Sequence, residues 1–263
     1  MSADRFSLEG KRALVTGASS GIGRAIALGL AEHGAGIVLH HFGDPRGAAG
    51  VAQEIGSDTP ILEADFTDTA AVSVFADDVL ANHGPIDILI ANAAIERRMP
   101  WQEASPEHIA AHVAANFTSL LTLTRRLVPA MAARGWGRVV ATGSVMAKRP
   151  RAESVVYASI KAAQLVAMRA IGREVAGRGV TMNVVSPGAI ETEATAHRYA
   201  DAAFRRAVVA KIPVGRQGRP DDLVGAFVFL CSDAASYVTG ADIPIDGGWT
   251  IGDAPGTLPG ETA

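Results

Sequence analysis

Cysteine is nearly absent from this sequence of 263 residues, which contains only Cys231. A single cysteine cannot form a disulfide within the chain, so the reducing cytoplasm is the expected location. Long hydrophobic runs are also missing, because none approaches the roughly 18 residues that a membrane-spanning helix needs. The first residues, from Met1 to Ser7, lack the apolar core of a secretion signal. We therefore expect no membrane partner.

An excess of either charge is missing as well. The 24 Lys and Arg residues nearly balance the 27 Asp and Glu residues, for a formal net charge of −3. Nucleic acid is therefore not an expected partner, since its binding needs a basic surface. Apolar residues make up 48% of the chain, which excludes intrinsic disorder. The seven histidines show no zinc-type spacing with cysteine, so we expect no metal site.

Short β-branched runs alternate with Ala- and Leu-rich stretches of helical period along the chain. This pattern predicts the α/β class, with a single doubly wound parallel sheet of the Rossmann type and helices on both faces. We expect one domain over residues 1–263, with an irregular tail from about 252 that is rich in Pro and Gly. The predicted strands are 12–16, 37–40, 61–63, 86–91, 138–142, 180–185 and 243–245, and the predicted helices are 22–33, 46–55, 70–82, 106–134, 154–177 and 221–230.

A glycine-rich turn joins the first predicted strand to the first predicted helix. The segment from Thr16 to Gly23 reads TGASSGIG, with the spacing G-x-x-x-G-x-G. Glycines let the backbone turn sharply and approach a ligand, and a helix N-terminus offers free N–H groups to a phosphate. The alternative is a glycine-rich turn without a ligand. The strand–turn–helix context favours a dinucleotide site.

Tyr157 and Lys161 lie four residues apart on a predicted helix, so their side chains share one face. A cation beside a phenol lowers the phenol's pKa towards the working range of a general acid–base. Ser144 follows a predicted strand at the carboxyl edge of the sheet, where its hydroxyl is placed to hold a substrate oxygen. An exposed, inert Tyr–Lys pair is the alternative. The serine and the glycine turn at the same edge favour catalysis.

With these residues in place, the chain resembles the short-chain dehydrogenase/reductase family over nearly its full length. Thr16–Gly23 is similar to the family's cofactor turn, and Tyr157 and Lys161 match its Y-x-x-x-K pair. The segment after the fourth strand departs from the family's N-N-A-G, with Ala91 for Asn and Ala94 for Gly. The resemblance implies cofactor contacts from Gly17, Ser19, Ser20, Gly21, Ile22, Gly23, His40, His41, Asp65, Phe66, Asn92, Ala93, Ala94, Tyr157, Lys161, Pro187, Gly188, Ile190 and Thr192.

The same resemblance implies four catalytic residues. Tyr157 exchanges a proton with the substrate oxygen, and Lys161 lowers the pKa of Tyr157 and binds the nicotinamide ribose. Ser144 orients the substrate oxygen, and Asn116 holds a water that links Lys161 to solvent. The expected reaction is hydride transfer between a nicotinamide cofactor and an alcohol or carbonyl substrate.

The choice between NAD and NADP depends on the end of the second strand. An acidic residue there binds the ribose 2′-hydroxyl and repels a 2′-phosphate. In this sequence His41 occupies that position, and Asp44 comes only later. The feature that excludes NADP is therefore missing. We expect NADP or dual use of NADP and NAD.

Several segments look closest to the bacterial glucose (aldose) 1-dehydrogenase branch of the family. In that branch the residues that correspond to Glu96, Lys148 and Asp201 lie near the sugar. Charged groups suit a polyhydroxylated ligand, because they can bond to many hydroxyls. Met146 departs from a His of that branch and Thr195 from an Asn, so glucose itself is not assigned.

The expected function is thus an NAD(P)-dependent oxidoreductase that acts on a sugar or polyol. One alternative is a reductase of 3-oxoacyl or xenobiotic ketones. A second is a non-catalytic dinucleotide-binding regulator, which would have no need of Ser144, Tyr157 and Lys161 together. The two longest predicted helices, 106–134 and 154–177, correspond to those that pair subunits in the family. We therefore expect a homodimer or homotetramer.

Overall fold

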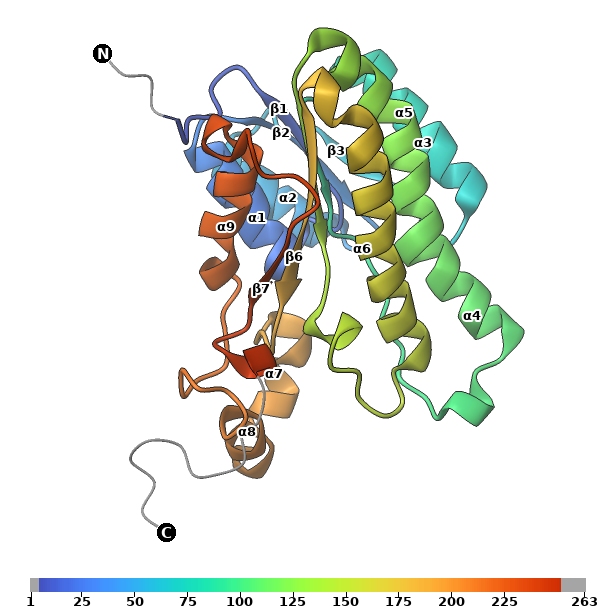
Figure 1. Cartoon of the computed structure of the whole chain (residues 1–263), viewed down its shortest axis with the longest axis vertical. Helices are drawn as coiled ribbons and strands as arrows, with labels where there is room; N and C mark the ends of the chain where they lie inside the picture. The colour runs from blue at the N-terminus through green and yellow to red at the C-terminus, as the bar shows by residue number, and fades with distance from the viewer. Residues whose placement is uncertain (1–4, 252–263) are drawn as a thin grey trace.

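The computed structural model describes residues 5–251, which form one parallel sheet covered by helices on both faces (Figure 1). The strand order is β3-β2-β1-β4-β5-β6-β7. The strands are β1 (Arg12–Val15), β2 (Gly36–His41), β3 (Ile61–Glu63), β4 (Ile88–Ala91), β5 (Gly137–Thr142), β6 (Val180–Pro187) and β7 (Asp242–Ile245). The predicted fold class is confirmed. The expected tail from about 252 lies outside the described residues.

Alternate residues of the strands point to opposite faces and build two cores. On one face, Leu14, Leu89 and Val139 pack under α3 (Thr69–His83), α5 (Ser119–Arg134) and α6 (Val155–Val175). On the other face, Val15, Ile90 and Val140 pack under α1 (Gly21–Glu32), α2 (Pro45–Ile55) and α9 (Asp221–Cys231). The strands are therefore apolar on both sides, as the sequence predicted for a buried parallel sheet.

Local signals explain where several helices begin. Ser105 caps α4 (Pro106–Val113) by accepting a hydrogen bond from the His108 amide at 3.2 Å, and Pro106 is the first residue of the helix. Asp44 and Asp68 cap α2 and α3 in the same way. These side chains satisfy amide groups that a helix leaves without a partner in its first turn.

The predicted helix 106–134 is not uniform. It consists of α4, a π-helical turn over Ala114–Thr118, and α5. A π turn inserts one extra residue per turn and is found most often at functional sites. Here it contains Asn116, and hydrophobic periodicity gives no signal for it.

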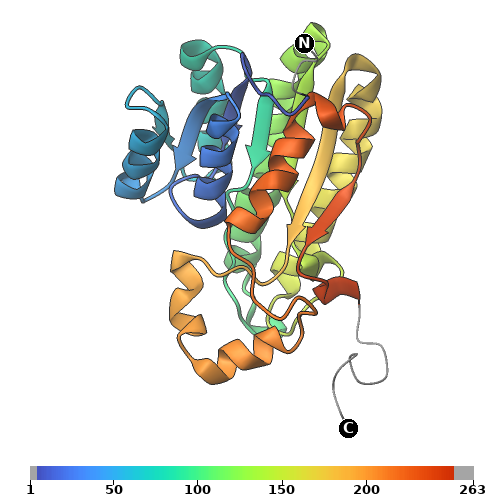
Figure 2. The ribbon, with the colours of Figure 1, turned by 90° about the vertical axis from the view of Figure 1, so that its left-hand side faces the viewer.

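Two short helices follow β6 and were not predicted. These are α7 (Glu193–Tyr199) and α8 (Ala202–Val209), which extend beyond the carboxyl ends of β6 and β7 (Figures 1 and 2). Thr192 and Thr195 form a reciprocal capping box at α7, and Asp201 caps α8. Those caps were the available signal, but both helices are too short to show a clear period.

One described segment, Val155–Arg178, is long and apolar enough to cross a membrane by length and composition. The segment is not an unbroken apolar run, because it contains Lys161, Arg169 and Arg173, so it does not contradict the expectation from the sequence. The segment contains α6, which packs along β6 and carries Lys161 buried on its inner face. Core helices of globular proteins meet the same criterion, so the finding is weak support for a membrane span.

Candidate active site

The glycine turn closes between β1 and α1 in a conformation that needs its glycines. Gly17 and Gly21 have φ angles of 64° and 53°, in the left-handed region that L side chains rarely adopt. A Cβ on Gly23 would lie 2.0 Å from the carbonyl oxygen of Gly17. The turn is therefore as tight as the sequence spacing indicated.

The N-terminus of α1 attracts an anion from the chain itself. Ser20 makes no side-chain cap, and the Gly21 amide donates a 3.2 Å hydrogen bond to Oε2 of Glu193, from α7. This carboxylate lies where the helix dipole favours negative charge. The same amides suit the pyrophosphate of a dinucleotide, so the residues present fit such a group.

A cavity of about 420 Å³ opens beside this turn at the carboxyl ends of β1, β2 and β4. Nine of the expected cofactor residues line it: Gly17, Ser19, Ser20, His40, Asp65, Phe66, Asn92, Ala93 and Ala94. Sequence reasoning missed the other lining residues: Phe42, Ala64, Thr67, Ile95, Arg97 and Ala115. The exposed aromatic Phe42 was the one detectable signal among them.

His41 does not line this cavity. Successive residues of β2 alternate in direction, so His40 and Phe42 face the cavity while the His41 side chain is buried. Its Nδ1 lies 3.9 Å from Oε1 of Glu63. The residue that lines the cavity at this strand end is therefore Phe42, one position later than the sequence pattern suggested.

His40 links β2 to the glycine turn. Its Nδ1 accepts a 3.1 Å hydrogen bond from the Gly17 amide, and its Nε2 lies 3.0 Å from the Ala64 carbonyl oxygen. The ring stacks on Phe66 at 4.0 Å between centroids. Burial lowers the pKa of His40 to about 4, so the imidazole is neutral and can accept from one nitrogen while donating from the other.

Asn92 links the carboxyl ends of β1, β4 and β5 through hydrogen bonds. Its Nδ2 donates to the carbonyl oxygens of Thr16 and Gly17 at 3.0 and 3.1 Å, and the Thr142 hydroxyl donates to its Oδ1 at 3.0 Å. Thr16 Oγ1 in turn accepts from the amides of Asn92 and Ala93. Ala91 and Ala94, where the sequence departs from the family's N-N-A-G segment, do not disrupt this hydrogen-bond network.

The segment from Pro187 to Thr192, which was expected to contact the cofactor, lies against the glycine turn. A Cβ on Gly21 would approach the Thr192 side chain within 3.2 Å. Gly188 lies so close to Asp246 that a Cβ would come within 2.7 Å of it, and Ile190 packs on the α1 and α9 core. These residues are therefore close to the α1 N-terminus but do not line the cavity beside it.

Ser144, Tyr157 and Lys161 converge after β5. Ser144 follows the strand, and its hydroxyl forms a hydrogen bond with Tyr157, which lies in the first turn of α6. Lys161, one turn further, is buried and donates a 2.6 Å hydrogen bond to the Thr142 carbonyl oxygen. Its Nζ lies 5.4 Å from the centre of the Tyr157 ring. The structure thus brings the three groups together.

The pKa of Tyr157 is raised, opposite to the direction expected from the Tyr–Lys spacing. Burial is the largest cause, and the nearby Glu96 carboxylate acts in the same direction, while the Ser144 hydrogen bond and Arg151 act against it. Burial also lowers the pKa of Lys161 to about 8. Loss of solvation outweighs the neighbouring cation, because it disfavours charge on both groups. Tyr157 is therefore protonated at neutral pH in this arrangement.

The Asn116 side chain forms two hydrogen bonds with the backbone that follows β4. Its Oδ1 accepts from the Ile95 amide at 2.8 Å, and its Nδ2 donates to the Ile95 carbonyl oxygen at 2.9 Å. Its own carbonyl oxygen accepts a hydrogen bond from Nε2 of the buried Gln164. These contacts assign the carboxamide to positioning of the loop, and the expected water-holding role stays a prediction.

The three expected substrate residues have different surroundings. Glu96 pairs with Arg151 close to Tyr157. Lys148 lies 2.8 Å from Oδ2 of Asp242 in an ion pair, and Asp201 accepts hydrogen bonds from the first amides of α8. Only Glu96 is therefore placed beside Tyr157 by the contacts of the described residues.

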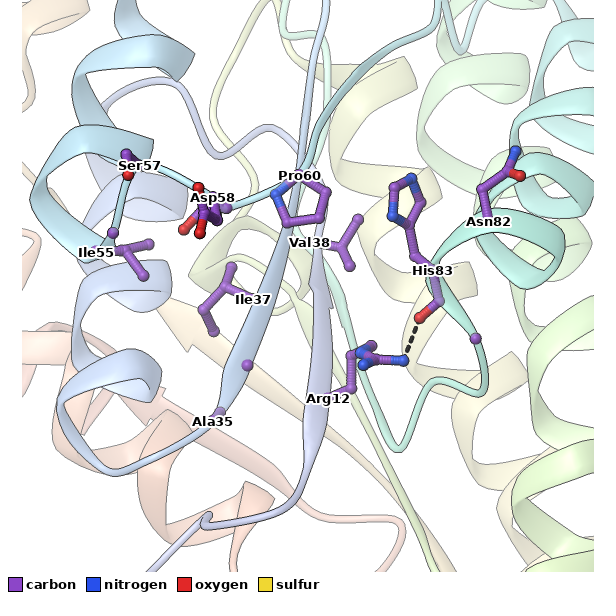
Figure 3. A pocket seen from close by; sticks show the side chains of 14 residues that line it. Arg12, Ala35, Ile37, Val38, Ile55, Ser57, Asp58, Pro60, Asn82 and His83 are labelled. Atoms are coloured by element: carbon purple, nitrogen blue, oxygen red, sulfur yellow. Dashed lines mark hydrogen bonds between the residues drawn. The ribbon is translucent and has the colours of Figure 1, made fainter.

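A larger cavity, of about 710 Å³, lies at the opposite end of the sheet (Figure 3). Arg12, Ile37, Asp58, Pro60 and His83 line it, and the Arg12 guanidinium donates to the His83 carbonyl oxygen. It lies at the amino ends of β1 and β2, whereas parallel α/β sheets bind ligands at carboxyl ends. Among residues 5–251 no group of three or more His, Cys, Asp or Glu is arranged to hold a metal ion.

Comparison with known proteins gives consistent matches. A family model described as enoyl-(acyl carrier protein) reductase matches residues 17–250. A 2-dehydro-3-deoxy-D-gluconate 5-dehydrogenase of Pseudoalteromonas atlantica is 39% identical over 94% of this chain and 98% of its own. A 3-oxoacyl-[acyl-carrier-protein] reductase of Escherichia coli is 36% identical over 92% of this chain and 98% of its own. A putative NAD(P)-dependent gluconate 5-dehydrogenase from Beutenbergia cavernae, crystallised with NADP at low occupancy, superposes with a TM-score of 0.88 at 38% identity, covering 95% of this chain and 100% of that one.

Proposed function

This chain belongs to the short-chain dehydrogenase/reductase family, and from that premise we propose that it oxidises a hydroxyl, or reduces the matching carbonyl, of a sugar, sugar acid or polyol with NAD(P). The observation that carries the proposal is the convergence of Tyr157, Ser144 and Lys161 at the edge of the sheet that also holds the glycine turn. Relatives named for gluconate-type substrates and the charged side chains beside Tyr157 support the substrate class.

Each residue has a distinct task in this reaction. Ser144 holds the substrate oxygen against Tyr157. In reduction, protonated Tyr157 donates its proton to the carbonyl oxygen, and in oxidation Tyr157 first releases its proton and then takes one from the hydroxyl. Lys161 keeps a positive charge next to the phenol, fixed by its bond to Thr142. A dinucleotide held along the glycine turn supplies or accepts the hydride, and the protein contributes position and proton transfer.

Replacement of Tyr157 tests the assignment directly. We expect Tyr157→Phe to lower turnover by about 10²- to 10⁴-fold, the range for loss of a general acid–base, while NADP binding measured by calorimetry persists. Ser159→Ala, on the exposed side of the same helix, is the matched control and is expected to keep full turnover. A Tyr157→Phe enzyme with more than about a tenth of wild-type turnover would show the assignment to be wrong.

The cofactor is expected to be NADP, with NAD accepted to some degree. His40 and Phe42 line the cavity at the end of β2, and Asp44 is occupied as the cap of α2. The end of β2 therefore contributes no carboxylate to the cavity that would repel a 2′-phosphate. The acidic lining residue, Asp65, follows β3, and Arg97 contributes a positive charge. We expect kcat/KM with NADP to equal or exceed that with NAD. A strong preference for NAD in steady-state assays would contradict this expectation.

A reductase of 3-oxoacyl or other ketones is the second candidate. The 36% identity to an acyl-carrier-protein reductase favours it. A panel of aldoses, aldonates, alditols, ketones and 3-oxoacyl thioesters, followed at the absorbance of reduced nicotinamide, separates the two. Binding of NADP without turnover of any of these substrates would instead point to a dinucleotide-binding regulator. We further propose a cytoplasmic homodimer or homotetramer, as the resemblance implies.

A further inference from the structure

Two loops meet beside the catalytic tyrosine. The first follows β4 and includes Glu96 and Arg98, and the second follows β5 and includes Arg151 and Glu153. The Met99 amide donates a 3.0 Å hydrogen bond to the Glu153 carbonyl oxygen, and Arg98 pairs with Glu153 at 3.2 Å. Arg151 pairs with Glu96. These contacts hold the two loops together as one wall.

The second loop is strained at Glu153. Its φ angle of 63° is the only positive value for a non-glycine residue among residues 5–251. Such a conformation costs free energy, and it persists only where the surrounding contacts hold it. The contacts of Glu153 with Arg98 and Met99 provide that constraint. These contacts therefore hold the loop that contains Arg151 in one conformation.

Two hydrogen bonds hold the Arg151 guanidinium in place and still leave it able to bind a ligand. Its Nε donates a 3.1 Å hydrogen bond to the hydroxyl of Ser154, which is buried, and its Nη2 donates to Glu96. No described residue accepts from Nη1. The Arg151 side chain is about one-third exposed, at 34%. A fixed, planar fork of this kind recognises a carboxylate through two parallel hydrogen bonds.

Positive charge exceeds negative charge around Arg151. Arg98 and Arg198, together with burial, lower the pKa of Arg151, which means that their guanidinium groups are close enough to repel it. Arg98 has Glu153 as its partner. Arg198, on α7, lies over the Phe204 ring at 4.9 Å and has no carboxylate partner in the described part of the chain. An anion bound between Arg151 and Arg198 would relieve this repulsion.

The charged wall is close to the reacting groups. Arg151 donates a hydrogen bond to Ser154, the N-cap residue of α6, and Tyr157 lies in the first turn of that helix. In agreement with this placement, Glu96 raises the pKa of both Tyr157 and Lys161, and Arg151 lowers that of Tyr157. A substrate whose hydroxyl meets Tyr157 therefore places its next polar groups near Glu96 and Arg151.

We propose that Arg151 binds a carboxylate group of the substrate in exchange for Glu96, with Arg198 adding positive charge nearby. The substrate is then a hydroxy acid of the sugar type rather than a neutral aldose or polyol. This inference rests on the proposed function and names its substrate class. Glu96 orients the guanidinium and competes with the substrate carboxylate for it.

The test compares acids with neutral analogues of the same chain length, namely gluconate with sorbitol and threonate with threitol. Wild type is expected to have a higher kcat/KM for each acid. Arg151→Met is expected to lower the acid-to-polyol ratio of kcat/KM by about 10- to 100-fold, the value of a hydrogen bond to a charged group. Arg151→Lys should keep part of the preference for acids over polyols, because lysine keeps the positive charge but lacks the planar guanidinium that makes two parallel hydrogen bonds. Arg198→Met should lower the ratio less.

Arg126→Gln is the matched control. Arg126 has a similar exposure, 39%, and pairs with Asp77 on the outer helices, so its loss should leave the ratio unchanged. Glu96→Gln removes the competing carboxylate and should lower KM for the acids. A ratio in Arg151→Met within twofold of wild type, with the fold intact by circular dichroism, would overturn the inference while leaving the proposed function standing.

A different assay result would show that the proposed function itself is wrong. If wild type turns over neither acids nor polyols, that function is wrong. Calorimetric titration of gluconate into the NADP-loaded protein then still decides the role of Arg151. A Kd at least tenfold weaker in Arg151→Met supports the inference. Equal binding by the two proteins, or no binding by wild type, refutes it.

Discussion

At the scale of single residues, burial controls the chemistry more than neighbouring charge does. Lys161 loses solvation, and its pKa falls to about 8, while the pKa of Tyr157 rises. Both shifts favour the neutral form, as expected for groups removed from water. Spacing along the helix placed the two side chains correctly, but spacing holds no information on how deeply they lie.

His40 provides a pH prediction at this scale. Its pKa is about 4 in the folded protein and near 6.5 in the unfolded chain. The unfolded chain therefore binds more protons between these values, and the contribution of neutral His40 to stability is complete above pH 6.5 and lost as pH falls towards 4. The shift corresponds to about 3 kcal/mol.

We expect His40→Gln to flatten the fall in unfolding free energy between pH 6.5 and pH 4.5, measured by urea denaturation. His197→Gln, at an exposed position of α7, is the control and should follow wild type. Parallel pH profiles for His40→Gln and wild type would show that protonation of His40 does not oppose folding.

At the scale of elements, glycine has opposite effects in a turn and in an exposed helix. Gly23 has no space for a side chain, since a Cβ would lie 2.0 Å from the Gly17 carbonyl oxygen. Gly50, within α2, has open space around it, because a Cβ added there would meet no atom within 4 Å. The first glycine is required by a close approach, and the second only weakens its helix.

Substitution by alanine separates the two cases. Gly23→Ala is expected to destabilise the protein by about 1–3 kcal/mol, the usual cost of overpacking, and to weaken NADP binding. Gly50→Ala is expected to stabilise it by about 0.5–1 kcal/mol through helix propensity. Thermal unfolding and calorimetric titration measure both effects. A Gly23→Ala protein with normal stability and NADP affinity would show that the turn has room to adapt.

The irregular elements at the carboxyl edge are those that sequence periodicity missed. The π turn at Asn116 and the helices α7 and α8 each span eight residues or fewer. A helical period needs several turns to become visible, so short elements are recognised only from caps. These elements lie at the carboxyl edge of the sheet, where the candidate site is, and irregular backbone is common at such edges.

At the scale of the whole molecule, the outer helices expose apolar side chains. Ile109 and Val113 share one face of α4, and Val155 and Val166 share one face of α6, with exposures of 42%, 38%, 49% and 65%. α4 and α6 are in contact with each other. Exposed apolar surface of this kind is characteristic of subunit interfaces.

Sedimentation tests the expected association. Wild type at micromolar concentration is expected to sediment as a dimer or tetramer, and Val166→Lys to shift it towards smaller species, because an unpaired charge would be buried at the interface. Val74→Lys, at an equally exposed position of α3, serves as the control, with 69% exposure. A monomeric wild type would refute the assembly, and an unchanged Val166→Lys would place the interface elsewhere.

The sequence by itself determined the fold class, the glycine turn and the residues Ser144, Tyr157 and Lys161, because each depends on local spacing or on alternation that the chain shows directly. Only the tertiary structure decided that Phe42 rather than His41 faces the cavity, that Lys148 is bound to Asp242, and that Arg151 stands beside Tyr157. Those facts depend on which loops meet after folding and on how much water each side chain loses. Neither quantity is encoded in the distance between two residues along the chain.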